Sequence, residues 1–320
     1  MSVATEGLVR TWSPGRPLDL GATLGPLRRG SGDPTFRYDS TARRGGGLWF
    51  TTRTPDGTAT LRLAVRAADG EVVGTAWGDG AAWVLDGLPA LLGGHDDVEG
   101  FDGAGLVARY PALRDTFRTH GGWRVPRTRR VLEALAPAVL EQKVTGREAW
   151  SAWRSLVRWY GDKAPGPAEV LPPDLYVAPD ARTVVRVPSW DWHRAGVDLS
   201  RSRTLVTAAT RAGRLEALVD RPPADAATAL RTLPGIGVWT AAEVGQRALG
   251  DADAVSVGDF HLAKRVGHAL VGAPVDDDAM LELLEPYRGH RYRVQRLVEL
   301  SGHAPARRGP RFAGRDFRAM

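Results

Sequence analysis

The stretch Leu233-Pro234-Gly235-Ile236-Gly237-Val238-Trp239-Thr240-Ala241 is the part of the sequence that decides the fold. An amphipathic segment over residues 224–232 precedes it and another over residues 239–249 follows it, so it is predicted to be a tight turn between two helices. Gly235 and Gly237 have no Cβ, which lets the backbone turn sharply and approach a partner closely. Leu233 and Ile236 are the apolar residues expected to anchor the turn between its helices.

The helix that opens after this turn is predicted to bind phosphate. Its first backbone N–H groups lack partners, and its N-terminus carries the positive end of the helix dipole. Such a turn holds the DNA backbone without reading the bases. The alternative is a plain helix–turn–helix connection, because short Gly-x-Gly turns are common without any ligand. The nine residues together favour DNA binding through Leu233, Gly235, Ile236, Gly237, Val238 and Thr240.

The order Leu-Pro-Gly-Ile-Gly-x-Trp-Thr-Ala resembles the helix-hairpin-helix of the HhH-GPD superfamily of DNA glycosylases. Within that superfamily it is most similar to the 3-methyladenine DNA glycosylase II (AlkA-like) branch. The resemblance lies in motifs over about residues 125–305 and only in domain order over residues 1–100. It implies that the partner is double-stranded DNA containing a damaged base.

Asp259 lies in the segment Val255-Ser256-Val257-Gly258-Asp259, twenty-two residues after Gly237. The superfamily has an Asp at about this distance, so the resemblance implies that Asp259 is the catalytic carboxylate. Hydrolysis of an N-glycosidic bond passes through an oxocarbenium-like sugar, which a carboxylate stabilises while it orients the attacking water. Asp259 also fits an N-cap of the helix predicted from Phe260 to Leu270. The two roles are compatible.

Trp239 occupies the hairpin position at which lyase-type relatives carry a Lys that forms a Schiff base with the sugar. Because Trp cannot do so, the resemblance implies a monofunctional enzyme that leaves an intact abasic site. It also places Trp239 in the base pocket, where an indole face stacks on a cationic purine; the alternative is an ordinary core Trp. The family's second pocket aromatic falls at Glu243, which cannot stack but could hydrogen-bond a base edge.

Two further segments complete the candidate site. Glu141-Gln142-Lys143-Val144-Thr145 resembles the family's loop that fills the gap left by the extruded nucleotide, so Gln142 and Lys143 are expected to bind DNA. Lys143 falls at the inserting position and could instead contact phosphate. Trp190 belongs to a Trp-x-x-His segment resembling one in relatives and is a candidate pocket wall, with core packing as the alternative.

No cofactor is expected to be required. The sequence contains no Cys, which excludes disulfides, Cys-ligated zinc and a Cys-ligated iron–sulfur cluster. The family's hairpin–phosphate arrangement is compatible with a structural monovalent cation held by the backbone carbonyls of Leu233, Ile236 and Val238.

The chain of 320 residues is 43% hydrophobic and carries a net charge of +6, which favours two packed domains and a polyanionic partner. Residues 1–105 are predicted to form an α+β domain with an antiparallel sheet, from strand-like runs at 47–52, 58–65, 71–74 and 81–85. Residues 106–305 are predicted to be an all-α HhH-GPD domain, and residues 306–320 a basic C-terminal tail. The helices are expected near residues 128–140, 146–160, 201–218, 224–232, 239–249, 260–271, 277–287 and 291–301.

The sequence therefore predicts a monofunctional DNA glycosylase that releases damaged bases, alkylated purines by resemblance, during base excision repair. Two alternatives stay open: a glycosylase for oxidised, deaminated or mispaired bases, to which Glu243 points, and a non-catalytic DNA-structure-binding protein. No apolar run reaches the ~18–20 residues of a membrane span, so no membrane contact is expected. We expect a cytoplasmic, nucleoid-associated monomer.

Overall fold

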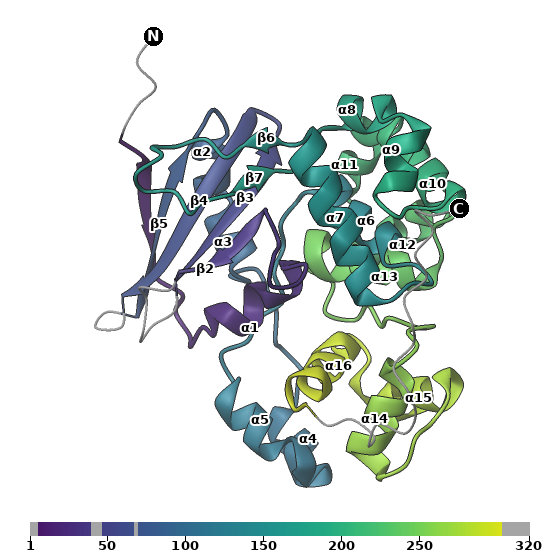
Figure 1. Ribbon diagram of the computed structural model, residues 1–320. Coiled ribbons are helices and arrows are strands. Elements are labelled where there is room, and N and C mark those ends of the chain that lie inside the picture. The colour runs from purple at the N-terminus through teal and green to yellow at the C-terminus, as the bar shows by residue number, and fades with distance from the viewer. Residues whose placement is uncertain (1–5, 40–46, 67–69, 303–320) are drawn as a thin grey trace.

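The computed structural model describes residues 6–39, 47–66 and 70–302 of the chain, and the basic tail predicted for residues 306–320 lies outside them. An antiparallel sheet near the N-terminus packs against a larger helical part (Figure 1). This is the predicted fold class. Among the described residues, no helix combines the length and the apolar character needed to cross a membrane.

The sheet has five antiparallel strands in the order β1-β5-β4-β3-β2. Strands β3 and β4 are joined by a tight turn at Pro55-Asp56, and Thr54 pairs with Gly57 across it. Successive side chains of a strand point to opposite faces, so the sheet buries two sets of apolar groups. The bounds are β1 (Leu8–Trp12), β2 (Phe36–Tyr38), β3 (Gly47–Thr54), β4 (Gly57–Arg66) and β5 (Glu71–Trp77).

Each face of the sheet is covered by a different part of the chain. Leu48 and Phe50 face a cluster formed with helices α1 (Leu20–Leu24), α2 (Ala81–Asp86) and α3 (Leu88–Leu91), next to the short helix η1 (Gly25–Leu27). Trp49 faces the other way and stacks on Trp77, with ring centroids 5.7 Å apart. A small two-stranded sheet, β6 (Asp162–Lys163) and β7 (Tyr176–Val177), packs there.

The prediction that residues 81–85 continue the sheet is wrong, because they form helix α2. Ala81, Val84, Leu85 and Leu88 are spaced i, i+3, i+4 and i+7, which places all four on one face of a helix. All four are buried against the sheet. The apolar run that resembled a strand is the buried face of helices α2 and α3.

The helical part consists of two lobes with separate apolar cores. The upper lobe contains α6 (Val131–Leu140), α7 (Gly146–Tyr160), α8 (Ala181–Arg186), α9 (Ser189–Arg194), α10 (Leu199–Ala209), α11 (Ala212–Glu216), η3 (Ala217–Asp220), α12 (Pro223–Leu230), α13 (Val238–Val244) and the π-helical turn η4 (Gly245–Leu249). The lower lobe contains α14 (Leu262–Val271), α15 (Asp277–Leu284), η5 (Glu285–Tyr287) and α16 (Arg291–Leu300). Every predicted helix is present, and the one predicted over residues 201–218 is divided into α10, α11 and η3.

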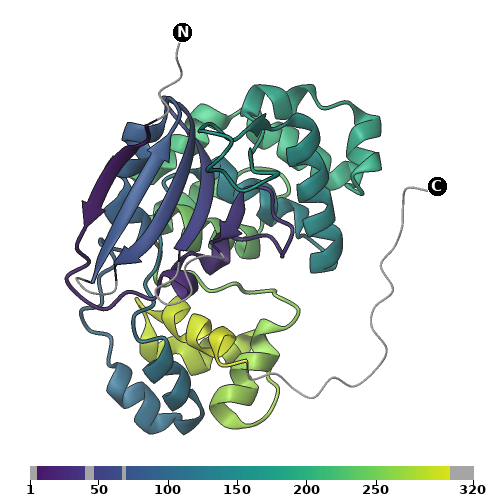
Figure 2. The ribbon, with the colours of Figure 1, turned by 60° about the vertical axis from the view of Figure 1, so that its left-hand side comes forward.

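The lower lobe also contains a segment that precedes the upper lobe in the sequence. Helix α4 (Gly103–Arg109), η2 (Pro111–Leu113) and α5 (Arg114–Thr119) lie beside α14 and α16 (Figure 2). Leu106 and Leu113 share a core with Leu262 and Leu297. The predicted domain boundary between residues 105 and 106 therefore falls inside helix α4.

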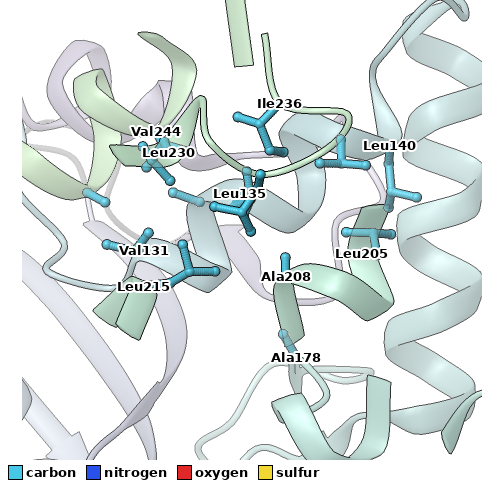
Figure 3. Close-up of a cluster of buried hydrophobic side chains, with 14 of the residues drawn as sticks. Val131, Leu135, Leu140, Ala178, Leu205, Ala208, Leu215, Leu230, Ile236 and Val244 are labelled. Atoms are coloured by element: carbon cyan, nitrogen blue, oxygen red, sulfur yellow. The ribbon is translucent and has the colours of Figure 1, made fainter. Parts of the chain in front are cut away.

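The hairpin is anchored in the core of the upper lobe, as predicted. Leu233 and Ile236 are buried there, and Ile236 lies near Leu135 and Leu140 of helix α6 (Figure 3). Helix α13, which follows the hairpin, packs along α6. Residues 250–261, which carry Asp259, run from the end of η4 to the start of α14 and so link the two lobes.

Candidate functional site

The two glycines of the hairpin meet different demands. Gly235 has φ +85°, and a Cβ there would lie 2.1 Å from Thr204 Oγ1, so both the backbone conformation and the packing require glycine. Gly237 has φ −96°, and a Cβ there would meet no atom within 4 Å. Gly237 is the N-cap of α13, so the hairpin presents an open surface beside the first N–H groups of that helix.

Gln142 braces the hairpin from the turn between α6 and α7. Its Nε2 donates hydrogen bonds to the Gly235 carbonyl and to Thr240 Oγ1, both at 2.9 Å. Thr240 is only 2% exposed, so its side chain is not available to DNA. A DNA contact by Thr240, as predicted, would have to come from its backbone N–H in the first turn of α13. The amide nitrogen of Gln142 is likewise occupied, because both of its hydrogen bonds go to the hairpin.

Lys143 lies in that same turn, next to Gln142, and its side chain is exposed. Its backbone is left-handed, with φ +55°, a conformation that costs a non-glycine residue about 1–2 kcal/mol. Helix α7 starts three residues later at a capping box formed by Thr145 and Glu148. The exposed lysine is thus held at the tip of a turn that is tied to the hairpin.

Asp259 is half-buried in the linker between the lobes. Its Oδ1 accepts hydrogen bonds from the backbone N–H groups of His261 at 2.8 Å and Leu262 at 2.9 Å. Asp259 therefore accepts the first N–H of α14, whose N-cap residue is His261 and which begins two residues later than predicted. Within the described part of the chain, Oδ2 accepts no hydrogen bond. One carboxylate oxygen is fixed by the backbone, and the other is left for a ligand.

Ser256 fixes the linker that carries Asp259. Its Oγ donates to Glu243 Oε1 at 2.7 Å and accepts from Gln246 Nε2 at 2.9 Å. Its backbone N–H donates to Gln295 Oε1 at 3.1 Å, and its carbonyl accepts the N–H of Asp259 at 3.2 Å. Ser256, Glu243, Gln246 and Gln295 are all buried. This network, the Ser256 network below, connects the linker to both lobes.

Glu243, which the sequence analysis placed in the base pocket, is buried and hydrogen-bonded inside the protein. It is 8% exposed, and its second oxygen, Oε2, pairs with Arg247 at 2.8 Å. Burial raises the pKa of Glu243, and the guanidinium of Arg247 opposes this shift. Because Ser256 and Arg247 engage both carboxylate oxygens and the side chain is buried, Glu243 is not exposed to a base edge.

The sheet domain contributes Arg29, which the sequence analysis missed. Arg29 lies between η1 and β2, is buried, and has its Nη1 3.7 Å from Glu141 Oε1. Burial lowers the pKa of Arg29, while the carboxylates of Glu141 and Glu243 oppose that shift. An arginine in a Gly-rich loop does not stand out among 43 Lys and Arg residues in the sequence. Only the packing of the loop against the end of α6 shows that Arg29 is buried beside Glu141.

Trp239 and Trp190 lie on different helices of the upper lobe. Trp239 is half-buried in the first turn of α13, one helical turn before Glu243. Trp190 is 71% exposed on α9, a helix that packs on α10 whereas α13 packs on α6 and α12. Trp190 is therefore not packed in the core, and its role as a pocket wall stays a prediction.

Phe260 is a second aromatic residue at the site that the sequence analysis did not assign. It follows Asp259 directly and is 76% exposed, with Lys264 Nζ 4.5 Å from its ring centroid. A large apolar side chain predicted at the first turn of a helix, next to Asp259, was the available sign. The exposed ring provides a surface for stacking beside Asp259.

The hairpin carbonyls are compatible with the expected monovalent cation, which stays a prediction. The carbonyl of Leu233 accepts the N–H of Ile236 at 3.1 Å, so the turn is closed by one hydrogen bond. A carbonyl oxygen has two lone pairs, and the second lone pair of Leu233 remains for an ion. No group of three or more His, Asp or Glu side chains able to hold a metal occurs in the described ranges.

Comparison with known proteins identifies the fold. No protein-family model and no curated protein matches the chain. A 3-methyladenine DNA glycosylase from Archaeoglobus fulgidus superposes with a TM-score of 0.73 at 17% identity, over 91% of this chain and 98% of its own. An 8-oxoguanine glycosylase/lyase from Clostridium acetobutylicum, in complex with double-stranded DNA, gives 0.67 at 12% identity over 92% and 97%. MBOgg1 in complex with a low-affinity DNA ligand gives 0.69 at 13% identity over 94% and 97%. The fold is that of the helix-hairpin-helix DNA glycosylases.

Proposed function

We propose that this protein is a monofunctional DNA glycosylase that hydrolyses the N-glycosidic bond of a damaged base in duplex DNA, acting as a monomer. The observation that carries the proposal is the state of Asp259. One of its oxygens is fixed by two backbone N–H groups, and the other is free at the junction of the two lobes. The hairpin with its open Gly237 surface supplies a phosphate-binding element, and the Ser256 network ties its following helix to the linker that carries Asp259.

In the proposed reaction the hairpin and the exposed Lys143 hold the DNA backbone while the damaged nucleotide is extruded from the duplex. Extrusion costs a few kcal/mol of unstacking, which contacts to phosphate and to Lys143 offset. As the bond between sugar and base breaks, positive charge develops on the sugar ring. The free oxygen of Asp259 stabilises that charge and orients the water that adds to the anomeric carbon.

Trp239 supports the monofunctional assignment. An indole cannot form the Schiff base that a Lys at this hairpin position would form, so the water is the nucleophile and the product is an intact abasic site. Borohydride reduction during turnover is therefore expected to yield no covalent DNA adduct. If an adduct forms, the monofunctional assignment is wrong, and replacing Lys143 or Lys264 by Met would identify the amine.

We propose cationic alkylated purines as the substrate class. A purine methylated at N3 or N7 is already an activated leaving group and requires no general acid, and a cationic base stacks well on the electron-rich face of Trp239. The alternative, an oxidised, deaminated or mispaired base, loses its main support because Glu243 is engaged with Ser256 and Arg247.

The decisive experiment is base release by the purified protein from four otherwise identical duplexes. These contain methylated purines, 8-oxoguanine, uracil or no lesion, and the free base is separated chromatographically. We expect release from the methylated duplex alone. Release from another lesion would correct the substrate class, and binding without release from any duplex would show a non-catalytic DNA-binding protein.

A further inference from the structure

Helix α7 carries a row of three arginines and one tryptophan along one face. Arg147, Trp150, Arg154 and Arg158 are spaced i, i+3, i+7 and i+11, which places them in line on a helix. Arg147, Trp150 and Arg158 are exposed and Arg154 is half-buried. No ion pair within 4.0 Å among the described residues involves any of these three arginines.

The sheet domain extends this row through the loop over residues 28–35 and the strand β2 that follows it. A Cβ on Gly30 would lie 2.7 Å from Trp150 Cε3, and a Cβ on Gly32 would lie 3.0 Å from Arg154 Cδ. The indole and the arginine stem therefore pack directly on the loop backbone, where the sheet domain meets α7 (Figure 1). We call Arg28, Arg37, Arg154 and Arg158 the arginine seam.

The seam concentrates like charges. The pKa of Arg37 is lowered, first by burial and then by the guanidinium groups of Arg158 and Arg28, while Asp33 and Asp174 act in the opposite direction. Asp33 is fully buried and accepts hydrogen bonds from the N–H groups of Arg29 and Thr35, so it does not pair with the seam. After burial, Asp33 has the largest effect on Arg37, yet none of the four arginines forms an ion pair within 4.0 Å with a described carboxylate, and positive charges gathered in this way favour a polyanionic ligand.

We propose that the arginine seam binds the phosphodiester backbone of duplex DNA flanking the nucleotide held at Asp259, which makes the sheet domain part of the DNA interface. The inference rests on the proposed function. Besides its charge, the seam is continuous with the proposed DNA contact at Lys143. Helix α7 starts three residues after Lys143, and Arg147 in its first turn lies between Lys143 and the seam. From Arg147 to Arg158 the helix rises about 16 Å, the length of about five base pairs.

The test is the salt dependence of binding to an undamaged duplex of 24 base pairs. Each phosphate contact contributes about 0.9 to the slope of log K against log salt concentration. We expect the double variant Arg154→Gln/Arg158→Gln to lower the slope by about 1.8. The control is Arg182→Gln/Arg186→Gln, which removes the same charge from two exposed arginines on α8, a helix that packs on α10 away from the seam. The control should keep the wild-type slope.

A second duplex, of 10 base pairs, separates the seam from the hairpin. Because the seam is expected to contact only DNA beyond the hairpin, the difference between wild type and the seam variant should shrink on the short duplex. Thermal unfolding of both double variants shows whether they fold as wild type does.

An unchanged slope in a folded seam variant, or an equal change in the α8 control, would overturn the proposal; the first result would point to an acidic protein partner for this surface. If the wild-type protein binds no DNA at all, the proposed function itself fails first. A reduced slope in a protein that releases no base would instead support the seam and contradict only the catalytic assignment.

Discussion

The hairpin at residues 233–241 and the linker at residues 250–261 are held in place by opposite means. The hairpin is held by apolar anchors, Leu233 and Ile236, and offers backbone groups. The linker is held by buried hydrogen bonds centred on Ser256 and offers one side chain, Asp259. A backbone ligand site depends on local shape, whereas a catalytic carboxylate depends on what surrounds it.

This difference predicts how each region fails. Changes in the hairpin should affect DNA binding or folding and leave the chemistry of bound DNA intact. Changes in the linker should affect the chemistry and leave binding intact. The variants below test that division, starting with the one from which we expect the largest effect.

Asp259→Asn should reduce base release at least about a hundredfold, because the neutral amide cannot stabilise the cationic sugar. The amide oxygen still accepts the N–H groups of His261 and Leu262, so the fold and DNA affinity should persist. Single-turnover release and a binding titration measure the two effects. As a control, Asp277→Asn changes a carboxylate that accepts the N–H of Gly258 in the same linker and should retain most activity. Normal turnover by Asp259→Asn would refute the catalytic assignment.

The two hairpin glycines should separate folding from binding. Gly235→Ala places a Cβ at φ +85° against Thr204 and should lower the free energy of unfolding by about 2–3 kcal/mol. Gly237→Ala meets no protein atom, so stability should hardly change, but the methyl group projects where a phosphate would approach. We expect about tenfold weaker DNA binding, equivalent to ~1.4 kcal/mol. Chemical denaturation and binding titrations distinguish the two variants. Wild-type affinity in Gly237→Ala would mean that the hairpin does not hold the DNA backbone.

Ser256→Ala should give the smallest effect, a roughly fivefold to tenfold lower rate of release at unchanged DNA affinity. The loss of about 1 kcal/mol of hydrogen bonding loosens the linker without removing Asp259. Hydrogen exchange of the His261 and Leu262 amides should become faster, a readout that needs no substrate. Ser202→Ala removes a similarly buried hydroxyl, on α10, and serves as the control. If both variants lose the same activity, the Ser256 network acts only on overall stability.

The sequence predicted the local elements of the site well, for a physical reason. Helix spacing and glycine chemistry are properties of neighbouring residues, so the hairpin, helix α7 and the cap at Asp259 were all readable from short segments. The errors arose where short patterns are ambiguous. The apolar pattern of residues 81–85 is compatible both with a buried strand and with the buried face of a helix. In the structure these residues form a helix whose apolar face packs on the sheet.

Roles assigned to single side chains could not be settled from spacing. Glu243 and Thr240 fall at positions that suggest a pocket or DNA contact, but their neighbours in space, Ser256 and Gln142, occupy them. Trp190 is close in sequence to the buried Trp192 yet lies on the opposite, exposed side of α9. Whether a polar group is free depends on partners tens of residues away.

By itself the sequence determined the helix-hairpin-helix, the carboxylate that follows it and the absence of Cys chemistry, because each depends on residue type and near spacing. Only the tertiary structure decided which groups are available. It buried Glu243 against Arg247, left one oxygen of Asp259 without a hydrogen bond from the described residues, placed Arg29 of the sheet domain beside Glu141, and packed the loop that follows Arg29 on Trp150 and Arg154 of α7. Burial and hydrogen-bond pairing are properties of the packed chain, and they separate a reactive side chain from a structural one.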